Sequence, residues 1–174
     1  QFGIISRATV DNVTYNGSAF TPTPVVTDAT SGATLTNGTH FDYTYYANTN
    51  AGTALVVATG KEGTDYVGQV AVQKFTIQKA DPVVTPPVAA TLTYDGTGTP
   101  NHPATFQNLL TSEGSTTAGT MFWKLDDGEY SSVFSNDNFQ GKNAGDYTVY
   151  YKVVGDDNYN DVAEASITAT IAKK

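Results

Sequence analysis

Residues that could act as acids, bases or nucleophiles are few in this chain of 174 residues. It contains no cysteine, which excludes thiol catalysis, disulfides and thiolate zinc sites. Neither histidine lies in a hydrolase signature such as G-x-S-x-G or H-E-x-x-H: His40 stands beside an Asn-Gly turn, and His102 stands in Asn-His-Pro. The four glutamates fall in predicted loops and give no acid/base pair of the glycosidase type. We therefore expect a protein that is not an enzyme.

Acidic residues gather in two predicted turns of the second half. One group is Asp126, Asp127 and Glu129, and the other includes Asp156, Asp157 and Asp161. Clustered oxygen ligands suit Ca²⁺, but neither group has the EF-hand spacing. Turns also favour Asp because its short side chain hydrogen-bonds the nearby backbone. We expect turn formation and no cofactor, and we keep a structural calcium ion at Asp156, Asp157 and Asp161 as the alternative.

Aromatic residues offer a binding chemistry instead. Sugar rings stack on aromatic faces that polar groups flank, and Trp123, Tyr130 and Tyr150 supply such rings in the second half. The alternative is that these rings pack in the core or form cross-strand pairs. Adjacent residues of a strand point to opposite faces, so only one of Phe122 and Trp123 need lie in the core.

The composition favours strands as the elements that position these residues. Threonine (28) and valine (17) are abundant, leucine (6) is scarce, and Asp (13) outnumbers Glu (4), so strand and turn formers dominate over helix formers. At 39% hydrophobic and 15% charged residues, the chain has enough apolar material to fold. The predicted fold class is all-β.

The net charge narrows the range of partners. A formal charge of −8 and a pI of about 4.4 repel phosphate backbones and anionic membrane surfaces. No apolar run approaches the roughly 20 residues that span a bilayer. We expect neither nucleic-acid binding nor membrane insertion, and we expect a soluble monomer.

Four landmarks occur twice in the same order, which indicates an internal repeat. Tyr15-Asn16-Gly17 recurs as Tyr94-Asp95-Gly96 at an offset of 79, and Asn50-Ala51-Gly52 recurs as Asn143-Ala144-Gly145 at an offset of 93. Asp65-Tyr66 matches Asn158-Tyr159, and the closing strands that end at Lys79 and Lys173 match at an offset of 94. The predicted domains are therefore residues 1–80 and 81–174, the second with roughly 14 residues inserted between its first two landmarks.

Proline-rich sequence follows the predicted boundary. Residues 81–87 contain three prolines, each of which fixes its own φ and disfavours helix at the residue before it. Such a segment is semi-rigid, so we expect the two domains to be arranged end to end.

Alternating apolar residues and turn signals mark the strands. Strands are predicted at 8–15, 41–47, 54–59, 69–78, 121–125, 130–134 and 147–154. The apolar parity of the fourth changes near Gln73 and Lys74, which predicts a bulge, and residues 103–113 are the most helix-tolerant segment. Short strands spaced by turns are typical of a small β-sandwich, with a β-grasp-like sheet as the alternative.

The landmarks also carry a family resemblance over nearly the whole chain. Tyr-Asn/Asp-Gly near the start, the Gly38–Tyr43 strand, Asn-Ala-Gly opening a strand and a tyrosine before the closing strand resemble the tandem Ig-like (MBG-type) repeats of bacterial cell-surface, adhesin-like proteins. The second half looks like a longer variant of the same repeat. The resemblance implies two consecutive Ig-like β-sandwich domains and no catalytic residues. Other surface-exposed Ig-like domains contain an intramolecular Lys-Asn isopeptide bond, but no recognisable motif for such a bond surrounds the lysines of this chain.

The implied function is that of a non-catalytic stalk, spacer or adhesion segment in a secreted or cell-wall-attached bacterial surface protein. Its location would be extracellular, and its partners would be neighbouring repeats of the same protein. The alternative is a carbohydrate- or glycoprotein-binding module that recognises host or environmental glycans through the aromatic residues of the second domain. Repeats of this kind serve proteins of many activities, so fold alone does not choose between the two.

Overall fold

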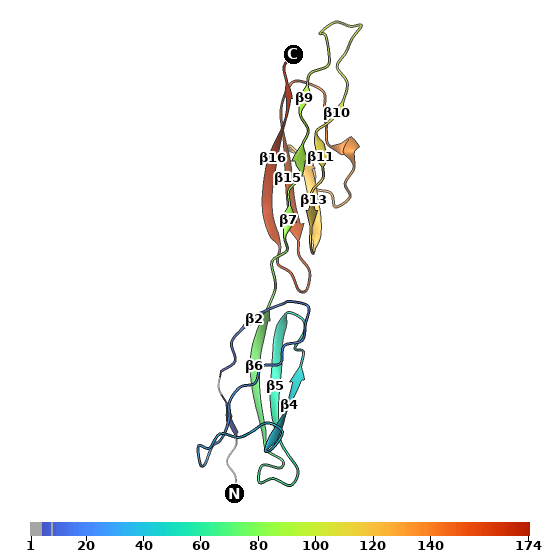
Figure 1. Ribbon diagram of the computed structural model, residues 1–174. Coiled ribbons are helices and arrows are strands. Elements are labelled where there is room, and N and C mark those ends of the chain that lie inside the picture. Colours follow the sequence, from blue (N-terminus) through green and yellow to red (C-terminus); the bar gives the residue numbers. More distant parts are fainter. Residues whose placement is uncertain (1–4, 8) are drawn as a thin grey trace. The chain divides into compact units, whose positions relative to one another are not determined.

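The computed structural model describes residues 5–7 and 9–174 and is all-β, with several sheets. The described part contains no α-helix, and its one helical turn is the 3₁₀ segment η1 (Asn136–Asn138). The chain divides into two compact units, Gln1–Ala80 (unit 1) and Asp81–Lys174 (unit 2) (Figure 1).

Unit 1 is built on one four-stranded sheet in the order β2-β6-β5-β4. Its strands are β1 (Ile5–Arg7), β2 (Val13–Thr14), β3 (Val26–Asp28), β4 (Phe41–Tyr46), β5 (Gly52–Gly60) and β6 (Val70–Gln78). Strands β4, β5 and β6 pair antiparallel in turn, whereas the short β2 runs parallel to β6. Strands β1 and β3 form a separate antiparallel pair.

Alternation of side chains explains why one face of this sheet is buried. Every second residue of a strand points to the same face, and Ala54, Val56 and Ala58 of β5 are all buried. Phe75 and Ile77 of β6 point to the same side. Residues outside the sheet complete the core: Val26 and Leu35 pack with Phe41, Ala58 and Ala71, and Val10, Val13, Tyr15 and Phe20 pack against Ala54, Phe75 and Ile77.

Asp28 is the one buried charged residue among those described, at 6% exposure. One carboxylate oxygen accepts hydrogen bonds from the backbone N–H groups of Thr30 (2.8 Å) and Ser31 (3.0 Å). The other accepts the Tyr66 hydroxyl at 3.0 Å. These bonds, the backbone ones first, hold the pKa of Asp28 below its ordinary value against the opposing effect of burial. A buried carboxylate is stable here because three donors surround it.

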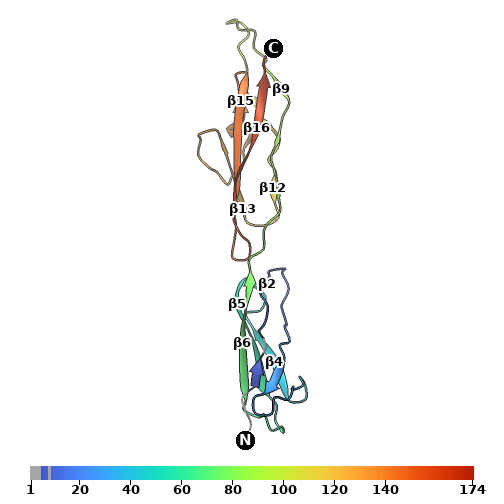
Figure 2. The same ribbon diagram turned by 90° about the vertical axis from the view of Figure 1, so that its left-hand side faces the viewer.

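Unit 2 is built on a four-stranded sheet in the order β13-β15-β16-β9. Its strands are β7 (Val84–Thr85), β8 (Val88–Ala89), β9 (Leu92–Thr93), β10 (Gln107–Asn108), β11 (Leu110–Ser112), β12 (Ser115–Thr116), β13 (Thr120–Leu125), β14 (Gln140–Gly141), β15 (Gly145–Val154) and β16 (Val162–Ala172). Both views show β15 and β16 side by side (Figures 1 and 2). Three two-stranded pairs, β8–β11, β7–β12 and β10–β14, complete the unit.

The two sheets repeat one strand order and one register. A short strand pairs in parallel with the last strand in each unit, Val13 opposite Ile77 in unit 1 and Leu92 opposite Ile171 in unit 2. The central strand opens in each case with a glycine of positive φ, Gly52 opposite Ile77 and Gly145 opposite Ile171. The repeated sequence landmarks therefore lie at equivalent places in the two sheets.

The register also locates the extra residues of unit 2. Tyr45 pairs with Val56, and Leu125 pairs with Val149. The offset between units is thus 80 at the strand before the connection and 93 at the strand after it. The extra residues therefore lie in the connection 126–144 between β13 and β15. Asp126 starts this connection at a φ of 47°, and its carboxylate accepts the backbone N–H of Thr148.

One pair of core positions exchanges large and small side chains between the units. In unit 1, Ala54 of the central strand lies opposite Phe75 of the last strand. At the equivalent pair in unit 2, the aromatic residue is Tyr147 and the small one is Ala169. Interiors are close-packed, so a ring fits on one strand where its partner is small. The same space is filled from opposite strands in the two cores.

Four local predictions differ from the structure. The sheet partner of β6 stays in register from Val70 to Ile77, so there is no bulge near Gln73; Val70 and Val72 instead point outward, 49% and 40% exposed. Residues 103–113 contain the short strands β10 and β11 rather than a helical turn. The predicted strand 130–134 is reduced to one bridge, Ser131 to Trp123. The strand predicted at 8–15 contains only β2, and Ala8 lies outside the described residues.

Candidate functional site

The outer face of the unit 2 sheet carries the candidate site. Val149, Tyr151 and Val153 of β15 are buried, so the residues between them, among them Tyr150 and Lys152, point to the opposite, outer face. The register places Lys124 of β13 directly opposite Tyr150. Directly opposed side chains of a sheet lie close enough to interact.

Tyr130 reaches this face from the longer connection of unit 2. Ser131 and Trp123 exchange two backbone hydrogen bonds of 3.0 Å each, which fixes residue 131 beside the edge of β13. Tyr130 is therefore next to Lys124 on the outer side. Its hydroxyl donates a hydrogen bond to the Glu164 carboxylate of β16. The Tyr130 side chain thus connects this segment to β16, the second strand from β13 in the sheet.

Two lysines lie against the tyrosine rings. The Lys152 ammonium nitrogen is 4.3 Å from the centroid of the Tyr130 ring, and the Lys124 nitrogen is 5.1 Å from the same centroid. Lys124 is also 4.8 Å from the centroid of the Tyr150 ring. All three distances are within the range in which the electron-rich face of a ring attracts a cation. We call Lys124, Lys152, Tyr130 and Tyr150 the cation–tyrosine cluster.

The cluster lies partly in solvent, and all four of its side chains are half-buried. Burial raises the pKa of the Tyr130 hydroxyl above its ordinary value, and the hydrogen bond to Glu164 and the negative charge of that residue raise it further. Tyr130 is therefore a neutral hydrogen-bond donor at physiological pH. The cluster offers two cations and two amphipathic rings to a ligand.

Trp123 lies on the opposite face of the sheet from the other two predicted carbohydrate-binding residues. Its side chain is 8% exposed and packs with Leu110, Phe139 and Val153 in the core of unit 2. Its indole N–H donates to the Glu113 carbonyl oxygen at 2.8 Å. The structure therefore brings Tyr130 and Tyr150 together but keeps Trp123 apart from them. Phe122, the alternative core residue, points outward, because Met121 and Trp123 take the inner positions.

The sequence reading did not assign Lys124 and Lys152 to this site. The sequence did contain a signal for these two lysines. Tyr150 and Lys152 are two positions apart in β15 and therefore point to the same face, and Lys124 lies shortly before the Asp-Asp-Gly turn. What the sequence did not show is the register that sets Lys124 opposite Tyr150. The distance of Tyr130 from either lysine depends on the path of the connection, which follows no strand periodicity.

The acidic residues proposed for calcium serve the turn between β15 and β16. The Asp156 carboxylate accepts the backbone N–H groups of Asn158 (2.8 Å) and Tyr159 (2.9 Å). The Asp161 carboxylate accepts the N–H of Gly155 at 2.7 Å. Asp157 is exposed in the same turn. Within residues 5–7 and 9–174, no three acidic or histidine side chains come together as a metal would need, so Asp156, Asp157 and Asp161 form no ligand group here.

Tyrosines of unit 1 have structural partners. The hydroxyl of Tyr45 donates to the Pro22 carbonyl at 2.9 Å, and that of Tyr43 donates to the Pro24 carbonyl. Both rings lie on the inner side of β4 and hold the extended segment 21–25 against the sheet. Tyr46 is 54% exposed at the end of β4. Unit 1 therefore has no counterpart of the cation–tyrosine cluster among its described residues.

Neither a comparison with protein-family models nor one with curated protein sequences found a match. A search of the described residues for a helix able to span a lipid bilayer also found none.

Proposed function

We propose that the chain is a non-catalytic structural or adhesion segment of a bacterial cell-surface protein, built from two consecutive Ig-like β-sandwich domains that act as a stalk or spacer. The observation that carries this proposal is the repeated sheet: one strand order, one register and one glycine at the start of each central strand occur in both units. Repetition of a self-contained unit suits a segment that acts as a stalk or spacer.

The composition of the cores supports the same proposal. Each hydrophobic cluster draws its members from one unit alone: Val26, Phe41 and their neighbours from unit 1, and Met121, Val149 and theirs from unit 2. A unit of 80 or 94 residues is long enough to bury its own core. Such a unit can be added or lost without disturbing its neighbours, as a stalk requires. Its partners in this proposal are the neighbouring repeats, and the chain itself is a monomer.

Surface location is the part of the proposal that can be tested first. Antibodies raised against the chain should label intact cells of the source organism, and brief protease treatment of those cells should remove the label. Labelling that appears only after the cells are permeabilised would contradict a surface location.

A second experiment separates a spacer role from a binding role. Replacing the chain with an unrelated spacer of equal length should preserve adhesion if the chain acts only as a spacer, and should abolish adhesion if the surface of the chain itself binds.

A second function, carbohydrate binding, is favoured by one specific observation. Tyr130 and Tyr150 lie together on a half-exposed sheet face, and neither ring is needed to fill the core. Amphipathic rings of this kind stack on sugar rings while their hydroxyls bond to the surrounding groups. In this second proposal the site is the cation–tyrosine cluster without Trp123. Titration of oligosaccharides against the whole chain tests it.

A further inference from the structure

We infer that the cation–tyrosine cluster binds the carboxylate of an acidic sugar within a glycan, with Lys124 and Lys152 as the residues that hold it. This inference rests on the carbohydrate-binding function proposed second above. It adds the chemical class of the ligand and two residues to the site.

The grouping of the two lysines is the first step of the argument. Unit 2 has five lysines against twelve acidic residues, yet two of these five place their ammonium groups within 5.1 Å of the centre of one ring. Two positive charges that lie against one ring repel each other. The faces of Tyr130 and Tyr150 offset part of that repulsion, and a bound anion would offset more of it.

The second step is that neither lysine is neutralised by the protein. No ion pair within 4.0 Å joins Lys124 or Lys152 to a described acidic residue, and the pair between Lys61 and Asp42 belongs to unit 1. Glu164 is the acidic residue that reaches the cluster, and its carboxylate accepts the Tyr130 hydroxyl. The Glu164 carboxylate is thus engaged at the hydroxyl end of the ring, and both ammonium groups keep donors for a ligand.

The third step concerns the kind of anion. A partly exposed tyrosine ring beside a cation suits a ligand that has an apolar ring face and a negative group on the same ring. A hexuronic or sialic acid residue has both. Nucleic acids and anionic membranes carry dense negative charge, which a unit with seven more acidic than basic side chains repels. A single carboxylate on a neutral glycan avoids that penalty.

The matched connection of unit 1 supports a specific role for the insertion. Strands β4 and β5 are joined by residues 47–51, whereas β13 and β15 are joined by residues 126–144, which include Tyr130. The equivalent outer face of unit 1 carries Leu55, Val57 and Val72 and one lysine, Lys74. The extra residues of unit 2 thus bring a ring over a pair of cations that unit 1 does not have.

The test compares each acidic sugar with its own methyl ester. The probes are an oligosaccharide with one glucuronate, one with one galacturonate, and sialyl-lactose, each titrated calorimetrically against the whole chain at low ionic strength. Esterification keeps the sugar ring and removes the charge, so it should weaken binding about tenfold or more. Raising the salt concentration should weaken binding of the acid and leave the ester unaffected.

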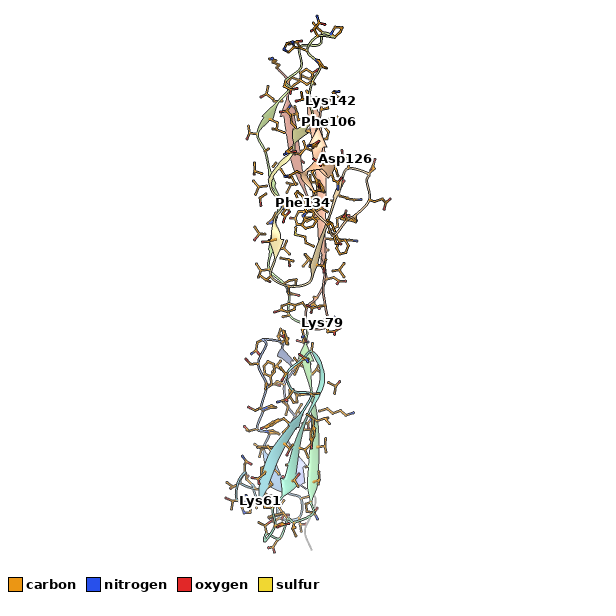
Figure 3. All side chains as sticks on the ribbon, turned by 90° about the vertical axis from the view of Figure 1, so that its right-hand side faces the viewer. Lys61, Lys79, Phe106, Asp126, Phe134 and Lys142 are labelled. Carbon is orange, nitrogen blue, oxygen red and sulfur yellow. The ribbon has the colours of Figure 1, made fainter. Side chains whose placement is uncertain are left out.

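Variants then assign the residues. Lys124→Met and Lys152→Met keep the apolar stem and remove the charge, and each should weaken binding of the acid about tenfold while leaving the ester unchanged. Lys142→Met is the matched control, because it makes the same change of charge at a lysine that lies 5.6 Å from the Phe106 ring, outside the cluster (Figure 3). It should leave binding unchanged. The comparison of acid with ester uses the unaltered protein and does not depend on how the variants fold.

The possible outcomes separate the inference from the function beneath it. Preference for at least one acid over its ester, lost in the Lys124 and Lys152 variants alone, supports the inference. Equal binding of acid and ester would overturn the inference and leave carbohydrate binding standing. Failure of every acid and ester to bind at millimolar concentration would overturn both, and the stalk proposal would be unaffected. Equal loss in the Lys142 variant would overturn the assignment to the cluster.

Discussion

Asp28 shows at the scale of one residue how a buried charge is made tolerable. One oxygen of its carboxylate accepts two backbone N–H groups and the other accepts the Tyr66 hydroxyl, so removing that hydroxyl would leave a buried oxygen without a partner. Because the Tyr66 hydroxyl bonds to a carboxylate, the stability of unit 1 depends on pH.

The direction of that dependence follows from the lowered pKa of Asp28. Because the folded pKa lies below the unfolded value of about 3.8, the carboxylate contributes stability that is fully present above that value and lost as the pH falls through the folded pKa. Asp28→Asn should therefore lower the melting temperature of unit 1 by several degrees at pH 7, and the difference from the unaltered protein should shrink in acid. Calorimetric melting of the whole chain across this range measures it.

A matched change at an exposed carboxylate serves as the control for Asp28. The side chain of Asp42 is 58% exposed and pairs with Lys61 at 3.3 Å, and such surface pairs contribute little. Asp42→Asn should leave melting nearly unchanged at every pH. An Asp28→Asn difference that stays constant from neutral to acid pH would show that the carboxylate is not stabilised as described.

Among the elements, the connection between β13 and β15 differs most from its counterpart in unit 1. It carries Phe134 (Figure 3). The Phe134 ring stacks on Phe139 at 5.1 Å and meets the Trp123 ring edge-to-face at 5.5 Å. Tyr130 of the same connection crosses to the outer face. The connection therefore contributes to both faces of the sheet, a core cluster on one and the candidate site on the other.

Phe134→Ala should loosen the inner contact of this connection. Loss of a half-buried ring and its two aromatic contacts should cost unit 2 about 2 kcal/mol. Trp123 is the one tryptophan of the chain, so its fluorescence emission should shift to the red and become more accessible to a quencher. Phe106→Ala is the control, because that ring is 66% exposed, and it should change neither stability nor emission. Unchanged emission in Phe134→Ala would contradict the packing.

The exchange of ring and alanine between paired strands gives a second prediction for the elements. Phe75→Ala should cost unit 1 about 3–5 kcal/mol through the cavity it leaves, and Ala54→Phe about 1–3 kcal/mol through overpacking. The double variant places the ring on the central strand, where unit 2 has Tyr147 opposite Ala169. Its cost should be at least about 1 kcal/mol less than the sum of the two, as a double-mutant cycle in urea would measure. Simple additivity would show that the two positions do not share one space.

Sequence periodicity predicted the long strands well and the irregular segments poorly. Alternation along 147–154 correctly assigned Val149, Tyr151 and Val153 to one face, because every second residue there is apolar. The same reasoning failed at Val70 and Val72, since apolar residues on an outer face look in sequence like a change of parity. It also failed for 130–134, where the backbone pairs with β13 at Ser131 alone. Tyr130, one of the four residues of the candidate site, lies in that irregular connection, so the sequence indicated the rings without their partners.

In the molecule as a whole, one arrangement of β-strands occurs twice, and each copy completes its own hydrophobic core. The division at Ala80 and Asp81, the repeated register and the separate hydrophobic clusters all point to this. Charge is distributed unequally, since unit 2 holds twelve of the seventeen acidic residues, so the two units should respond differently to salt and pH. Two separable unfolding transitions are the natural consequence.

The most direct measurement is to produce residues 1–80 and 81–174 as separate proteins and record their NMR spectra and melting curves beside those of the whole chain. Each fragment should give the dispersed spectrum of a folded β protein and a cooperative transition that reproduces one of the two transitions of the whole chain. A fragment that is unfolded alone, and folds only when the other is added or attached, would contradict the account.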